Sequence, residues 1–271
     1  MKLGLSGQMR ADGNRDRENH MMKKWMALAG ALMILTIAGM AIGEGMIPVA
    51  LEMDMDGTIA EGVDARDGIV TISRPGEYLL SGEMEQGQIF VNCAEDGKVT
   101  LYLNGVKVHN EQGPALIVGQ CQPRLMVSLV DGTENVLSDG TGMAQGADDP
   151  DGVIYSRSDL TITGSGSLSV EAGVLNGIVS RDDIRIEGGK IDIQAAGHGI
   201  KGKDSVEISG GEIVIRAGKD GIKATNKKDP ERGYVEISGG KISITCTDDA
   251  LSFITGCRVT GGEIYITMAE D

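Results

Sequence analysis

Aromatic residues and histidines are scarce in this chain of 271 residues. Phe, Trp and Tyr make up 3% of the sequence, and there are three histidines. Few aromatics beside 41 glycines favour many tight turns and a core of Ile, Val and Leu. The small number of histidines, together with cysteines that lack Cys-x-x-Cys spacing, argues against a zinc site.

Positive charge is also in short supply. The chain has 25 Lys and Arg against 40 Asp and Glu, a net charge of −15 that as a whole repels nucleic acid and anionic lipid surfaces. We therefore expect no nucleic-acid partner, and membrane contact only through the N-terminal segment. A disordered chain is excluded, because 41% of the residues are hydrophobic. If the chain is exported, its excess of carboxylates favours calcium as a bound ion.

The four cysteines are at positions 93, 121, 246 and 257. An even number permits two disulfides in an exported protein. Cys93 and Cys121 occupy comparable places in successive repeats, which permits a disulfide without requiring one. Cys246 and Cys257 fall in columns shared with Ala217 and Val206, so we expect buried thiols there.

Basic residues precede an uncharged apolar run at residues 25–42. Its 18 residues are short for a membrane-spanning helix, and Ala41 and Gly43 suit the −3 and −1 positions of a signal-peptidase site. A cleaved signal peptide and a retained anchor both stay open. Either one would direct export of the rest of the chain, because the Lys and Arg residues before the apolar run keep that end in the cytoplasm. We therefore predict an extracellular or cell-surface protein whose residues 1–43 are a signal peptide or membrane anchor.

A repeat of about 22 residues is the strongest signal in the sequence. Similar segments, some of them partial, begin at Asp159, Asp183, Ser205, Tyr234 and Cys257. The copies at Asp183 and Ser205 start 22 residues apart, and the next copy starts 29 residues later. The seven extra residues form an insertion at residues 226–232, NKKDPER.

Apolar and polar residues alternate within each copy, which is the period of a β-strand. Val206 and Ile208 precede a Gly-Gly turn, and Ile213 and Ile215 follow it. Equivalent positions would stack as core columns, with parallel strands about 4.8 Å apart. We therefore predict an all-β chain that forms a right-handed, single-stranded parallel β-helix, a solenoid over residues 67–271. Residues 44–66 would be a linker and capping segment, because a solenoid end must be covered.

Several strings of this sequence match a known family as a set: GEYLLSG, KVTLYLNGVKV, GPALIV, DGTENVLSDG, DGIKATN and the terminal DDAL. Over roughly residues 68–271 the chain resembles surface carbohydrate-binding β-helix proteins of anaerobic Gram-positive bacteria, which are likened to family 9 pectate lyases. The resemblance implies binding of plant polysaccharides such as polygalacturonate or cellulose, with bound calcium. The chain differs in carrying His198 where the repeat favours Asp.

Stacking would turn equivalent polar residues into neighbours. One predicted column holds Asn176, His198, Asp220 and Asp249, with Asp151 one repeat earlier, and another holds Asp182 and Asp204. Carboxylates about 5 Å apart must share a proton, pair with a lysine or bind a cation. The predicted calcium ligands are Asp182, Asp204, Asp220 and Asp249. Turn-stabilising bonds to backbone amides are the alternative, both here and for the cluster of Asp148, Asp149 and Asp151.

Lysines gather beside the second column. Residues 197–232 carry eight Lys or Arg against six Asp or Glu, in a chain that is otherwise strongly acidic. The predicted carbohydrate-binding residues are Lys201, Lys203, Lys223, Lys227 and Tyr234, with Lys228 and Arg232 also on the insertion. A basic face beside calcium suits an acidic sugar polymer, while solvated lysines are the alternative. Tyr234 and Tyr265 are the aromatics expected to be exposed.

Three functions stay open at this point. The preferred one is an exported, non-catalytic protein that binds acidic or plant cell-wall polysaccharide with calcium. The second is a calcium-dependent lyase similar to pectate lyases, in which Lys201 or Lys223 would remove the proton alpha to a uronate carboxyl group. The third is a structural or adhesive surface module without a sugar site.

Overall fold

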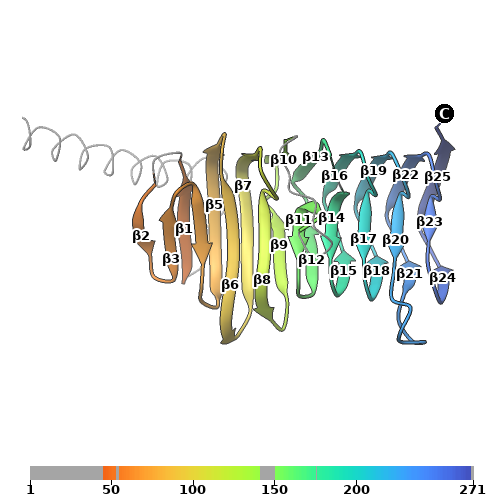
Figure 1. The fold of residues 1–271 in the computed structure, drawn as a ribbon, viewed down its shortest axis with the longest axis horizontal. Coiled ribbons are helices and arrows are strands. Elements are labelled where there is room, and N and C mark those ends of the chain that lie inside the picture. The colour runs from red at the N-terminus through yellow and green to blue at the C-terminus, as the bar shows by residue number, and fades with distance from the viewer. Residues whose placement is uncertain (1–44, 53–54, 141–149, 175, 270–271) are drawn as a thin grey trace, which may run out of the picture. The chain divides into compact units, whose positions relative to one another are not determined.

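The computed structural model describes residues 45–52, 55–140, 150–174 and 176–269, and Gly45 begins a compact unit (Figure 1). Every regular element within these residues is a β-strand, so the prediction of an all-β chain is confirmed there. The part of the chain that is described contains no helix long and apolar enough to cross a membrane. The apolar run at residues 25–42 lies outside it, as do Asp148 and Asp149.

One sheet has two branches that both start from the long strand β7 (Val99–Asn110), which follows β1 (Met46–Leu51) and β5 (Gly76–Met84). The first branch contains β9 (Leu125–Leu129), β12 (Leu160–Gly164), β15 (Asp183–Ile186), β18 (Ser205–Ile208), β21 (Tyr234–Ile237) and β24 (Gly256–Val259). The second branch contains β10 (Glu134–Asp139), β13 (Ser167–Ala172), β16 (Lys190–Ala195), β19 (Glu212–Ala217), β22 (Lys241–Cys246) and β25 (Glu263–Met268).

The other sheet begins with a short antiparallel meander and continues with parallel strands. The meander consists of β2 (Gly57–Ala60), β3 (Val63–Arg66) and β4 (Ile69–Ile72). The parallel strands are β6 (Gln88–Asp96), β8 (Leu116–Gln122), β11 (Gly152–Ser156), β14 (Asn176–Ser180), β17 (Ile200–Gly202), β20 (Ile222–Ala224) and β23 (Leu251–Ser252). Parallel pairing in both sheets agrees with the prediction of parallel strands.

The strand register aligns the apolar columns seen in the sequence. Leu160 pairs with Ile184, Ile184 with Val206, Val206 with Val235, and Val235 with Cys257. The longer step from Val206 to Val235 accommodates residues 226–232, which lie in the connection between β20 and β21. An insertion in one connection thus leaves the pairing of the strands intact.

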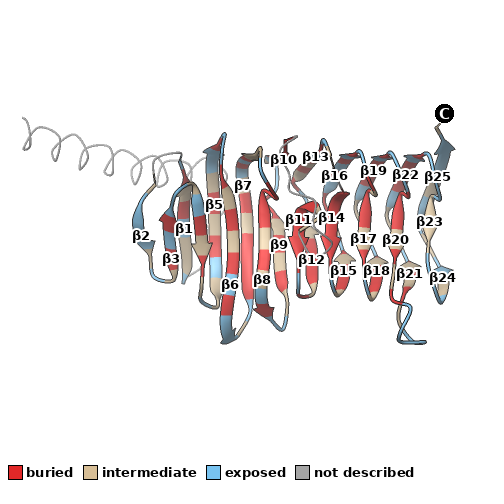
Figure 2. Ribbon diagram, in the orientation of Figure 1, coloured by how far each residue is buried: buried red, intermediate tan, exposed pale blue. Residues whose placement is uncertain are grey.

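Burial alternates along the strands, so the core lies between the sheets (Figure 2). On β16, Ile191, Ile193 and Ala195 are buried, whereas the residues between them are exposed. Ile, Val and Leu dominate this core, which includes the aromatic side chain of Tyr78. Burial of each such aliphatic side chain stabilises the fold by about 1.5–3 kcal/mol. The alternation of apolar residues along the strands therefore favours a core between the sheets.

Glycines are required at the turn between the two branches of the first sheet. Gly189, Gly211, Gly240 and Gly262 all have positive φ, between 86° and 94°. A Cβ atom on Gly211 would lie 2.9 Å from the backbone oxygen of Gly189. Both the left-handed conformation and the close approach of successive turns therefore favour glycine here.

All four cysteines are free thiols, so Cys93 and Cys121 form no disulfide. Cys246 is buried, as expected, but Cys257 is exposed, and the expectation for it was wrong. Cys257 does occupy the apolar column, but its strand β24 ends the first branch and no described strand pairs with its outer edge. For the same reason the last strands and their connections expose large apolar side chains, namely Phe253, Ile254, Val259, Tyr265, Ile266 and Met268.

Candidate functional site

The column that holds Asn176, His198, Asp220 and Asp249 forms a hydrogen-bonded ladder. Asn176 Oδ1 accepts from the backbone N–H of His198 at 2.8 Å, and His198 Nδ1 accepts from that of Asp220 at 3.2 Å. Asp220 Oδ1 accepts from the backbone N–H of Asp249 at 3.0 Å. Each side chain thus accepts a hydrogen bond from a backbone amide of the next turn. This is the arrangement expected if the column stabilises the turns rather than binding calcium.

Two of the predicted calcium ligands lie on this ladder. Asp220 is buried and also accepts a bond from Lys223 Nζ at 2.5 Å, so both its carboxylate oxygens have protein partners. Asp249 is exposed at the last position of the ladder. Neither residue lies in a group of acidic side chains close enough to share an ion, among the described residues.

His198 takes the neutral form in this ladder. Burial, followed by the positive charge of Lys223, lowers its pKa to about 4. The Oδ2 atom of Asp220 lies 3.2 Å from His198 Nδ1, but a neutral ring that accepts a backbone proton at Nδ1 cannot donate from the same atom. His198 therefore replaces an Asn or Asp acceptor without adding a charge.

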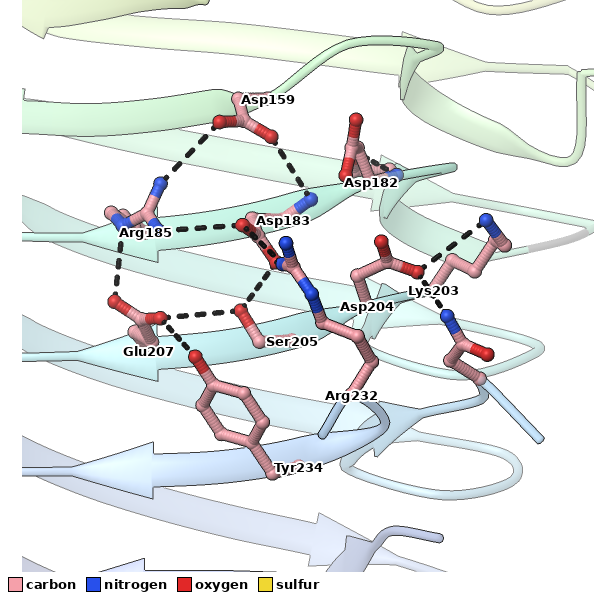
Figure 3. A network of polar contacts seen from close by, with 12 residues as sticks. Asp159, Asp182, Asp183, Arg185, Lys203, Asp204, Ser205, Glu207, Arg232 and Tyr234 are labelled. Atoms are coloured by element: carbon pink, nitrogen blue, oxygen red, sulfur yellow. Dashed lines mark hydrogen bonds and ion pairs between the residues drawn. The ribbon is translucent and has the colours of Figure 1, made fainter. Parts of the chain in front are cut away.

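The other predicted column belongs to an acidic cluster, defined here as Asp159, Asp182, Asp183 and Asp204 (Figure 3). One carboxylate oxygen from each of Asp159, Asp182 and Asp183 lies within 4.8 Å of the other two. These residues precede or begin the strands of the first branch, so successive turns bring them together. Asp182 was predicted as a ligand, whereas Asp159 and Asp183 were missed.

Two arginines neutralise one side of the acidic cluster. Arg185 lies 3.6 Å from Asp159, 3.3 Å from Asp183 and 3.0 Å from Glu207. Arg232 Nη1 lies 3.2 Å from both carboxylate oxygens of Asp183. Asp183 also accepts a hydrogen bond from a serine of the next turn, so its charge is compensated within the protein.

The negative charge of the Asp182 carboxylate is compensated less than the charges of the neighbouring carboxylates. Its pKa is raised, first by burial and then by the negative charges of Asp159 and Asp204. Asp204 itself lies 3.4 Å from Lys203 Nζ and accepts a hydrogen bond from Asn226 at 2.6 Å. Carboxylates that repel each other in this way favour either a shared proton or a bound cation.

The acidic cluster also anchors the insertion at residues 226–232. At its start, Asn226 donates to Asp204 and accepts from the backbone N–H groups of Lys228 and Asp229, at 2.9 and 3.1 Å. At its end, Arg232 binds Asp183. Both ends of the insertion are therefore held by the same acidic side chains.

A groove of about 450 Å³, which we call the basic groove, opens beside the acidic cluster. It is lined by Asp151, Val179, Ser180, Arg181, Lys201, Lys203, Thr225, Asn226, Lys227 and Lys228. Five of these side chains are cationic and one is a carboxylate. Lys203 and Asn226 contact the acidic cluster as well, so the groove and the cluster are neighbours.

The predicted carbohydrate-binding residues are only partly brought together. Lys201, Lys203 and Lys227 line the basic groove, although Lys201 Nζ is already bound to Asp151 at 2.6 Å. Lys223 points to the ladder instead, as its bond with Asp220 shows. Tyr234, expected to be exposed, is half-buried, because its hydroxyl donates to Glu207 at 2.7 Å.

Sequence reasoning missed Arg181, Arg185, Asp159 and Asp183. A signal was available for the two aspartates, since each directly precedes the first apolar residue of its strand, Leu160 or Ile184, and these two residues are paired. Arg185 gave no such signal, because its column holds residues of both charges and only the folded side chain shows which carboxylates it meets.

Three comparisons connect this chain to known proteins. The family model of carbohydrate-binding domain-containing proteins matches residues 66–271. A carbohydrate-binding domain-containing protein of Acetivibrio thermocellus is 34% identical over 189 residues, which is 64% of this chain. The aligned part spans 66% of that relative, just under two thirds.

A solved structure is also similar. It is the polysaccharide lyase-like protein from C. thermocellum, as a gadolinium derivative, with 34% identity and a TM-score of 0.70. The alignment covers 84% of this chain and 98% of that one. The match of the family model to most of the chain identifies the family: this protein belongs to the carbohydrate-binding domain-containing proteins.

Proposed function

We propose that this chain is an exported, non-catalytic protein that binds an acidic polysaccharide, such as polygalacturonate, in the basic groove with the help of calcium. One observation carries the proposal: a groove with five cations adjoins an acidic cluster, in a chain whose net charge is −15. Cellulose-like polymers of the plant cell wall are the second candidate ligand.

The chemistry of the basic groove favours an anionic sugar. Arg181 offers a planar fork for a carboxylate, and lysines such as Lys203 and Lys227 offer point charges on flexible stems. Asp151 is satisfied by Lys201, so it adds little repulsion. A chain of uronate residues would present one carboxylate per sugar to these side chains.

The charge balance of the acidic cluster favours one divalent cation. With Glu207, the four aspartates of the cluster carry five negative charges when all are ionised, and Arg185, Lys203 and Arg232 carry three positive charges. Two negative charges remain, which a single Ca²⁺ would neutralise. Calcium takes carboxylate oxygens in flexible geometry, so Asp182 and Asp204 would be its main ligands, with Asp159 beside them.

We further propose that the parallel strands form a right-handed, single-stranded β-helix, and that the family resemblance extends to the pectate-lyase-like members. Successive pairings at a constant interval in the register support this geometry. Residues 1–43 would direct export or anchor the chain, and residues 44–66 would link and cap the domain at residues 67–271, at the cell surface.

The lyase alternative has some support, since a similar structure is that of a polysaccharide lyase-like protein. Its candidate bases, Lys201 and Lys223, are bound to Asp151 and Asp220 at 2.6 and 2.5 Å. Both amino groups are therefore engaged by carboxylates of the chain itself, whereas a general base must lie within hydrogen-bond reach of the substrate proton, so binding is favoured over catalysis. Unsaturated uronate products, detected by ultraviolet absorbance and lost in Lys201→Ala, would establish the lyase instead.

Binding of polygalacturonate, measured by titration calorimetry in calcium and in EDTA, tests the proposal. The double variant Lys203→Ala/Lys227→Ala should bind at least about tenfold more weakly, since it removes two contacts with charged groups. The control is Lys190→Ala/Lys241→Ala, which removes two exposed lysines outside the groove. A blank result with polygalacturonate and with cellulose in both buffers would refute the proposal and favour the structural or adhesive module.

A further inference from the structure

A second groove, of about 540 Å³, lies near the N-terminal strands β4, β6 and β8 of the sheet that also carries the basic groove. Its polar side chains are those of Asp67, Gln86, Gln88, Asn110 and Gln112, and its apolar side chains are those of Ile69, Ile117, Pro114 and Pro150. Backbone of three glycines completes it. We call it the amide groove, because four of its five polar side chains are amides and none of its lining residues is Lys or Arg.

Two of the amides are held in place before any ligand arrives. Gln88 Nε2 and Asn110 Nδ2 both donate to the backbone oxygen of Pro114, at 2.9 and 3.0 Å. Asn110 Oδ1 accepts from the backbone N–H of Gln112 at 3.1 Å. Each side-chain NH₂ group has a second hydrogen to donate, so the two amides keep donor capacity at fixed positions.

The exposed side chains of the groove add amide groups that can adjust to a ligand. Gln86 and Gln112 are exposed, and each amide can donate and accept hydrogen bonds. Ile69, of which 39% is exposed, and Ile117 supply apolar surface beside them. A few polar groups that fix orientation, on a partly apolar surface, are the usual composition of a small-molecule site.

This composition selects for uncharged polyhydroxy ligands. A sugar ring offers hydroxyl groups that both donate and accept, and C–H faces that pack on apolar side chains. A uronate carboxylate would meet Asp67 and no positive side chain of the groove, so acidic sugars are disfavoured. The basic groove has the opposite preference.

The two grooves lie on the same sheet. Ile117 pairs with Tyr155, Tyr155 with Val179, and Val179 with Lys201. Ile117 belongs to the amide groove, whereas Val179 and Lys201 belong to the basic groove. Three strand spacings of about 4.8 Å separate Ile117 from Lys201, or roughly 14 Å. The two grooves therefore lie close together along this sheet.

We infer that the amide groove is a second carbohydrate site, specific for uncharged sugar residues and independent of calcium. The inference rests on membership of the carbohydrate-binding family, but neither on the basic groove nor on the acidic cluster. Together the two sites would suit a polymer, or a mixed cell-wall surface, that offers neutral and acidic sugars side by side.

Titration of the intact protein with cellohexaose, xylohexaose and mannohexaose, each in EDTA, tests the inference. At least one of these should bind, and Gln86→Ala/Gln112→Ala should weaken that binding at least tenfold. Both residues are exposed, and the substitution removes one long hydrogen bond, from the backbone N–H of Glu111 to Gln86 Oε1 at 3.4 Å, so the fold should be retained. Gln194→Ala, an exposed glutamine on β16, is the matched control.

The outcomes separate this site from the basic groove. Lys203→Ala/Lys227→Ala should leave neutral oligosaccharide binding unchanged, and the amide variant should leave polygalacturonate binding unchanged. If none of the three hexasaccharides binds, or if the lysine variant loses their binding while the amide variant keeps it, the inference is wrong. Either failure leaves the test of the basic groove intact.

Discussion

Replacing Asp182 by Asn should reverse the order of stability between variant and wild type when calcium is added. In the metal-free protein, Asp182 ionises against neighbouring carboxylates that lie within 4.8 Å. Two unit charges at that separation repel by about 3.5 kcal/mol at an effective dielectric constant of 20, and by about 1 kcal/mol in water. Asp182 is partly exposed, so the lower figure applies, and Asp182→Asn should raise the Tm by about 2–4 °C in EDTA at pH 7.

The pH dependence of that gain follows from the raised pKa of Asp182. The folded state holds the proton more tightly than the unfolded state, so the ionised carboxylate destabilises the fold above the raised pKa. This unfavourable contribution vanishes below the unfolded pKa of about 3.9. The variant should therefore be more stable than wild type at pH 7 and equal to it at pH 3.

When calcium is added, wild type should become more stable than Asp182→Asn. At a calcium concentration about 100 times Kd, wild type gains about 2.7 kcal/mol, whereas the variant loses a ligand and most of this gain. Calorimetry at pH 7 in EDTA and in calcium measures both effects. The matched control is Asp192→Asn, an exposed aspartate paired with Arg216, which should respond to calcium as wild type does. A calcium site at Asp182 is refuted if Asp182→Asn is destabilised in EDTA or keeps the full calcium response.

Three further variants test other parts of the account. Gly211→Ala should destabilise the fold by about 1–3 kcal/mol in urea titrations, whereas Gly132→Ala, also at positive φ but with open space around it, should show a smaller loss; equal losses would mean that close packing is unimportant. His198→Asn should keep the ladder but remove the loss of stability that wild type shows as the pH falls from about 6.5 towards 4, the range set by the lowered pKa; an unchanged pH profile would count against a neutral His198. Arg232→Ala should free one end of the insertion from Asp183, and proteolysis within residues 226–232 should accelerate by several-fold; no change would show that Asn226 alone suffices.

Much of the fold could be predicted from the sequence because the physics of stacking is periodic. Alternating apolar residues give strands, and equivalent residues of successive copies must then meet, as Ile184 and Val206 do. The insertion could be located as well, because it changes the interval in the sequence without changing the register. Exposure of Cys257 could not be inferred in the same way, since it depends on β24 ending its branch of the sheet.

The site was harder to predict, because a column of polar residues has more than one physical use. Asp220 and Asp182 look alike in the sequence, yet Asp220 accepts from a backbone amide and Lys223, while Asp182 faces other carboxylates. Arg232 reaches Asp183 across 49 residues, a contact that no local pattern encodes. The amide groove combines turns of several successive strands, and its glutamines have no repeat of their own.

A crystal structure of the protein soaked with trigalacturonate and calcium would show whether the basic groove and the acidic cluster form one binding site. We expect anomalous calcium density bound by Asp182 and Asp204, and sugar carboxylates in the basic groove near Lys203 and Lys227. Sugar bound elsewhere, or calcium density confined to Asp220 and Asp249, would contradict this expectation.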